Sequence, residues 1–160
     1  MGAMQANVFV LVSVVALRSA SQDPSRSPLH DRHTQELNAR GAEAMGFDQQ
    51  RTTHHFRLAP DGGRIEVEAN DPADRETKAR VVAHLRRIRQ QFADGDFSAP
   101  LQTHGEQPPG VPALQRLRHR IRYAFESTPG GGRVRLRTRD PEAREAIHEF
   151  LRYQIREHRH

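Results

Sequence analysis

The stretch DGGRIEVEANDP at residues 61–72 matches GGGRVRLRTRDP at residues 130–141 without a gap. Both contain Gly-Gly-Arg near the start and Asp-Pro at the end, with apolar residues in matched alternation between them. The alternation predicts a strand with one apolar face, and the glycines predict a hairpin turn before it. Asp-Pro is typical of a helix start, with Asp71 and Asp140 as the capping residues. We interpret the match as an internal duplication.

The residues around each copy complete a strand–turn–strand–helix unit, at 52–93 and at 113–159. The apolar helical positions are Val81, Leu85, Ile88 and Phe92 in the first unit and Ile147, Phe150, Leu151 and Ile155 in the second. Their spacing predicts one buried stripe on each helix. Neither unit can bury its apolar face alone. We therefore expect one α+β domain over 51–160, a four-stranded antiparallel sheet with both helices on one face.

Two further segments accompany these units. Residues 22–50 begin rich in Ser and Pro and are predicted to be a flexible linker with a short peripheral helix at Asp31 to Met45. Residues 94–112 join the units, and a connection of this length is predicted to be a loop that is flexible or functional. Val111 to Arg118 are predicted to form a brief helix before the third strand.

Residues 7–17 read NVFVLVSVVAL, a mainly apolar run of 11 residues. A membrane span needs roughly 20 residues, so this length favours the core of a signal peptide over 1–21, cleaved after Ser21. Residues 1–6 contain no Lys or Arg, so only the terminal amine supplies the usual positive charge. The alternative is a buried strand rich in Val. We expect a secreted or periplasmic protein with no membrane span once the signal peptide is removed.

The composition limits the chemistry. The 160 residues include no Cys, which excludes disulfides, thiolate metal sites and Cys nucleophiles. The formal net charge is +5, and Lys78 is the one Lys among 25 basic residues. Such an Arg bias often follows a GC-rich genome. It gives no strong nucleic-acid signal unless the arginines gather on one face.

Ten histidines in a chain of this size suggest a metal site. Alternation puts His54 on the apolar face of the first strand, and helical spacing puts His84 and His148 at the edges of the two buried stripes. These three are the candidate ligands for Cu, Zn or Ni, which imidazole binds well. The alternative is that each is a hydrogen-bonded packing residue.

His104 and Glu106 lie in the connection between the units and could act as an acid–base pair. The alternative is a solvated loop, and we favour a protein that is not an enzyme. His148-Glu149 is not a metalloprotease motif, because the next histidine is His158. The glycine-rich turns also lack the Gly-Lys-Ser/Thr of a phosphate-binding loop.

Outward positions of the second strand carry Glu66 and Glu68, whereas those of the fourth carry Arg133, Arg135 and Arg137. If the two strands are neighbours, their outer faces are complementary. If they are not, the three arginines are free to meet an anionic partner.

Four segments together resemble a family of short, uncharacterised bacterial proteins: AMGFDQQRTTHHF, IEVEANDPAD, GDFSAPLQTHGEQPPGVP and FLRYQIREH. The resemblance extends from about Asn38 to His158 and implies a secreted or periplasmic setting but no reaction. The leading hypothesis is a non-enzymatic binding or accessory protein of that compartment. An aspartate carbamoyltransferase label is not supported, because the string nearest to that enzyme's Ser-Thr-Arg-Thr-Arg loop, at residues 135–139, lacks the serine.

Overall fold

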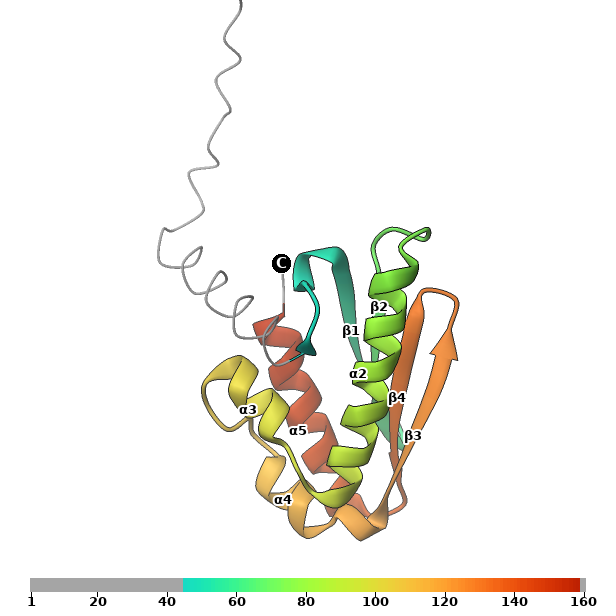
Figure 1. Cartoon of the computed structure of the whole chain (residues 1–160). Helices are drawn as coiled ribbons and strands as arrows, with labels where there is room; N and C mark the ends of the chain where they lie inside the picture. Colours follow the sequence, from blue (N-terminus) through green and yellow to red (C-terminus); the bar gives the residue numbers. More distant parts are fainter. Residues whose placement is uncertain (1–44, 159–160) are drawn as a thin grey trace, which may run out of the picture.

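A computed structural model of the chain describes residues 45–158 (Figure 1). The signal peptide predicted at 1–21 lies outside these residues, as does nearly all of the linker and peripheral helix predicted at 22–50. Within the described range, no helix is long and apolar enough to cross a membrane.

Four strands form one antiparallel sheet in the order β1-β2-β4-β3. The strands are β1 (Thr52–Ala59), β2 (Gly62–Ala69), β3 (Ile121–Thr128) and β4 (Gly131–Thr138). Together with the helices they confirm the predicted α+β fold. Strands β2 and β4 are neighbours, so the two hairpins meet edge to edge at the centre of the sheet.

The two hairpins take equivalent places in this sheet. Each strand of the second hairpin begins 69 residues after its counterpart, at 121 against 52 and at 131 against 62. The same offset relates Ile65 to Val134, and these two residues are paired opposite each other across β2 and β4. A local two-fold axis therefore passes between them, although the duplication itself stays a prediction about the origin of the sequence.

Two long helices, α2 (Arg75–Asp94) and α5 (Pro141–Glu157), lie on one face of the sheet (Figure 1). Helix α2 packs mainly on β3 and β4, whereas α5 packs mainly on β1 and β2. Each helix therefore covers the hairpin of the other unit. The two units consequently share one hydrophobic core instead of building two.

Both long helices begin at an Asp cap, as predicted, but the cap of α2 is a different aspartate from the predicted one. Asp140 caps α5 as predicted, and its side chain accepts a hydrogen bond from the Ala143 amide at 3.0 Å. Helix α2 begins three residues later than predicted, because Asp74 is its cap and accepts from the Thr77 amide at 3.0 Å. Asp71 instead accepts from the Ala73 amide and stabilises the preceding turn. A sequence with two aspartates three residues apart offers two caps, and packing selects one.

The connection at 94–112 is not a continuous loop. It contains helix α3 (Ser98–His104), and helix α4 (Val111–Arg116) begins at its end, with the 3-10 turn Arg118–Arg120 leading into β3. A second 3-10 turn, Gln49–Arg51, precedes β1. Helix α4 confirms the predicted brief helix before the third strand, although it ends at Arg116 and not at Arg118. It packs on α5.

One glycine explains how closely α5 approaches the sheet. A Cβ atom on Gly63 would lie 2.3 Å from Leu151 Cδ1 and 2.6 Å from the Arg57 carbonyl oxygen. Only hydrogen fits at this position, since real Cβ contacts are longer. Gly62-Gly63 therefore serves both the β1–β2 turn and the helix–sheet contact.

Candidate ligand-binding pocket

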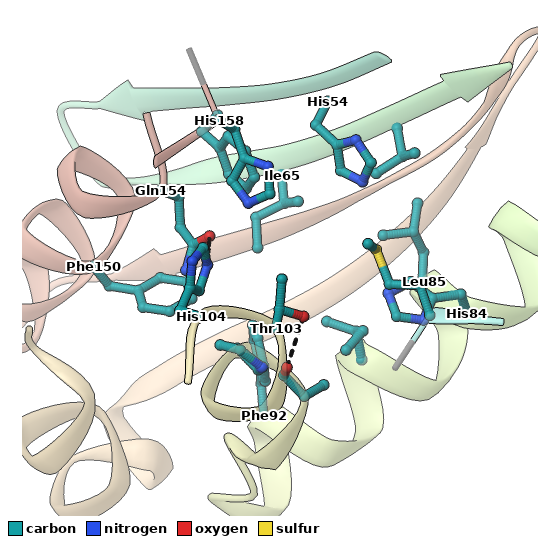
Figure 2. Close-up of a pocket in the computed structure, with 16 residues that line it drawn as sticks. His54, Ile65, His84, Leu85, Phe92, Thr103, His104, Phe150, Gln154 and His158 are labelled. Carbon is teal, nitrogen blue, oxygen red and sulfur yellow. Dashed lines mark hydrogen bonds between the residues drawn. The ribbon is translucent and has the colours of Figure 1, made fainter. Parts of the chain in front are cut away.

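A cavity of about 70 Å³ lies between the sheet and helices α2, α3 and α5 (Figure 2). Its walls are mostly apolar, and the wall side chains include Ile65, Val67, Leu85, Ile88, Phe92 and Phe150. The polar groups that line it are four histidines, Thr103 and Gln154. No Asp, Glu, Lys or Arg is among the lining residues of the described chain.

The four histidines come from four different elements. His54 belongs to β1, His84 to α2 and His104 to α3, while His158 follows the end of α5. The His158 ring stacks on His54 with centroids 5.6 Å apart and meets His104 edge-on at 5.3 Å. The Phe56 ring also packs against the His158 ring, with centroids 5.1 Å apart. The tertiary fold thus assembles a group of aromatic rings from distant parts of the chain.

His84 is held neutral. Burial, together with the nearby Arg87 and His54, lowers its pKa to about 3. Its Nδ1 atom accepts from the Arg87 guanidinium at 3.1 Å, because arginine can only donate. The ring proton of neutral His84 therefore resides on Nε2. The same ring meets Phe47 edge-on, with centroids 5.5 Å apart.

Gln154 is the buried polar group of greatest interest. It is only 4% exposed, and its side-chain amide forms a 2.9 Å hydrogen bond with His104 Nε2. The other polar atom of this amide, Nε2, has no hydrogen-bond partner among the described residues. A buried polar atom without a partner costs free energy, so a ligand that bonds to it would gain stability.

The three predicted metal ligands do not meet. His54 and His84 line the pocket, but His148 Nε2 lies 3.0 Å from both the Ala59 and the Gly62 carbonyl oxygens, at the β1–β2 turn. His148 belongs to the first half of α5, whereas the pocket residues of that helix belong to its second half. Across residues 45–158, no group of three or more His, Asp or Glu side chains could hold a metal ion. His84 would also have to release Arg87 or its Nε2 proton before it could bind one.

The predicted acid–base residues form hydrogen bonds with different side chains. His104 lines the cavity, whereas Glu106 is not among the lining residues and accepts a 2.8 Å hydrogen bond from the Tyr153 hydroxyl. Burial and this hydrogen bond raise the pKa of Tyr153. The two residues thus bond to neighbouring positions of α5, Gln154 and Tyr153. The acid–base pair stays a prediction without geometric support.

The three predicted arginines lie on β4 beside β2, so the complementary arrangement holds in part. Arg133 is opposite Glu66 and donates to Glu126 at 2.8 Å. Arg135, however, is opposite Arg64, and Arg137 is opposite Gly62. Complementarity therefore covers one of the three positions.

Sequence reasoning did not select Gln154 or Phe47. A signal for Gln154 was present, because it lies three residues after Leu151 and four after Phe150 on the buried stripe of α5. A polar residue at such a position is uncommon and points to a partner inside the core. Phe47 precedes the first unit, and nothing in its local pattern connects it to His84.

Comparisons with known proteins return no family model, no curated protein and no solved structure that matches this chain. The family resemblance and the activity therefore stay predictions from the residues.

Proposed function

We propose that this chain is a non-enzymatic binding protein and that its ligand occupies the histidine-lined pocket. The ligand is a small, largely apolar molecule with one hydrogen-bonding group. The observation that supports this is the unfilled hydrogen bond of the buried Gln154 amide, a group that lines a mostly apolar cavity.

The size of the cavity favours an alkyl chain over a ring. A dry cavity that holds benzene measures about 150 Å³, roughly twice the 70 Å³ found here. A second hollow of about 240 Å³ shares His54, Phe56 and His158 with the cavity. Because the two spaces share these three residues, they are adjacent, and we propose that a longer ligand extends from the cavity into the hollow.

The polar groups present support binding over catalysis. No carboxylate lines the cavity in the described chain, and the Thr103 hydroxyl donates to the Ala99 carbonyl oxygen at 3.0 Å. His104 is bonded to Gln154. Groups held in this way can position a ligand. An exported location remains part of the proposal and rests on residues 7–17.

The test is a ¹H–¹⁵N NMR titration with 1-hexanol as the probe. It measures the chemical shifts of the backbone and side-chain amides. We expect saturable shifts at the Gln154 side-chain amide and at residues of α3, and little change at the β3–β4 turn. In Gln154→Leu, which keeps the volume but lacks the amide, hexanol should bind about fivefold more weakly, the cost of one hydrogen bond. The matched control is Gln90→Leu on the exposed side of α2, which should bind as the wild type does.

Parallel titrations with Cu²⁺, Zn²⁺ and Ni²⁺ test the metal hypothesis in the same samples. If a metal shifts the signals of His54 and His84 and hexanol shifts none, the ligand of the pocket is the metal and not an organic molecule. Shifts with neither probe up to the solubility limit would contradict the proposed function.

A further inference from the structure

The face of the sheet opposite α2 and α5 carries an uneven distribution of charge. Its side chains form rows across the strands, because the register places residues of neighbouring strands opposite one another. One row contains Arg57 on β1, Arg64 on β2 and Arg135 on β4. Arg57 is opposite Arg64, and Arg64 is opposite Arg135. In the next row Arg137 is opposite Arg122 of β3. Five arginines and no carboxylate thus occupy these two rows.

The local two-fold axis shows that the fold did not require this arrangement. Rotation about the axis places the Arg57–Arg64–Arg135 row on the row that contains Glu126, Arg133 and Glu66. Two of the three equivalent pairs carry opposite charges, Arg57 with Glu126 and Arg135 with Glu66, whereas Arg64 and Arg133 carry the same charge. On the other face, three central positions stay apolar in both units: Phe56 and Phe125, Ile65 and Val134, Val67 and Leu136. Positive charge is therefore concentrated at one end of the sheet, although the backbone of the sheet has a local two-fold axis.

Repulsion within the arginine rows is only partly offset. Arg135 pairs with Glu126 at 2.9 Å, Arg137 pairs with Asp61 at 3.0 Å, and Arg64 lies 3.4 Å from Glu66. Within residues 45–158, Arg57 and Arg122 form no ion pair. Like charges directly opposite each other destabilise a sheet, so this end of the sheet would be stabilised by an anion.

The arginines also enclose a space. A hollow of about 160 Å³ is lined by Arg57, Arg64, Arg135 and Arg137, together with Asp61 and the β1–β2 turn. Neighbouring strands are about 4.8 Å apart, so the guanidinium groups of one row can reach a single compact anion. Guanidinium groups bind phosphate oxygens in pairs through parallel hydrogen bonds.

We propose that this hollow binds a compact phosphate-bearing small molecule through Arg57, Arg64 and Arg135. A small ligand is favoured over a polymer because the adjoining row carries Glu66 and Glu126 and the row after it carries Glu68. These carboxylates repel a chain of phosphates that continues along the strands. The site is separate from the histidine-lined pocket, which lies on the other face of the sheet.

Isothermal titration calorimetry with pyrophosphate tests the proposal, with the folded state of each variant checked by circular dichroism. We expect Arg64→Gln and Arg57→Gln each to weaken binding roughly tenfold, the effect of one lost charge-assisted hydrogen bond. Arg57 forms no ion pair in the described chain, so its loss removes no internal contact of this kind. Glu126→Gln should strengthen binding several-fold, because it frees Arg135. The control is Arg75→Gln at the exposed start of α2, which should bind as the wild type does.

Two outcomes would overturn the proposal. One is an equal loss of pyrophosphate affinity in Arg75→Gln, which would show that only the net charge matters. The other is a 20-nucleotide single-stranded DNA that binds more tightly than pyrophosphate and also loses affinity in Arg64→Gln, which would make the ligand a polymer. We expect Arg64→Gln to bind hexanol as the wild type does. This measurement separates a failure of the proposed phosphate site from a failure of the proposed function.

Discussion

Replacing His84 by Asn tests whether the pocket histidine is buried in its neutral form. Asn has no titrating group, and its side-chain oxygen can accept from Arg87 as Nδ1 of His84 does. Burial lowers the pKa of His84 from an ordinary 6.5 to about 3 in the folded protein. The unfolded chain therefore binds a proton at pH 5 that the folded protein does not.

The size of the effect follows from linkage. The free energy of unfolding rises with pH wherever the unfolded state binds more protons than the folded state. The stability that depends on a neutral His84 is therefore fully present above pH 6.5 and is lost as the pH falls toward 3. Each pH unit in this window costs about 1.4 kcal/mol. Between pH 7.5 and pH 5, His84 should therefore lower the free energy of unfolding by about 2 kcal/mol.

Urea unfolding followed by far-UV circular dichroism, at pH 7.5, 6.5, 5.5 and 5, measures this difference. The wild type should lose about 2 kcal/mol more than His84→Asn over that range, since the other histidines are common to both proteins. His119→Asn, at an exposed position, is the control and should follow the wild type. Parallel curves for the wild type and His84→Asn would refute the assignment of a buried, neutral His84.

Two further predictions concern the fold. Gly63→Ala should lower the free energy of unfolding by about 1–3 kcal/mol, because its Cβ would overlap Leu151 Cδ1. Gly130→Ala meets only the Glu68 side chain, at 3.0 Å, and should cost less in the same urea titration; equal costs would contradict the close helix–sheet contact. The Ala143 amide and Arg120 hold the pKa of Asp140 below its usual range, so this carboxylate stabilises the fold above pH 4 and loses that effect as the pH falls. The melting temperature of Asp140→Asn should therefore depend less on pH than that of the wild type between pH 5 and 2, and equal slopes would argue against a charged cap.

The repeated pattern was sufficient to predict the strands and their antiparallel pairing within each hairpin. Period-two alternation on both sides of a glycine turn leaves little choice of secondary structure, and Asp140-Pro141 placed the start of α5 correctly. Helix α3 was not predicted because it is only seven residues long and has no apolar stripe. Short helices of this kind depend on packing more than on local preference.

The convergence of side chains could not be predicted in the same way. His54 and His84 were selected from local spacing, but so was His148, which the fold places at the far turn. Local periodicity fixes the face of an element on which a residue lies. It does not fix the position of that residue along the neighbouring element, which depends on how the elements are stacked.

The sequence by itself determined the elements, their apolar faces and the equivalence of the two halves, because these depend on interactions between residues close in the chain. Tertiary structure alone decided that each helix covers the other unit's hairpin and that β2 pairs with β4 so that Arg64 is opposite Arg135. Both features depend on contacts between distant segments, whose register is set by side-chain packing across the shared core. The pocket and the arginine rows follow from that register.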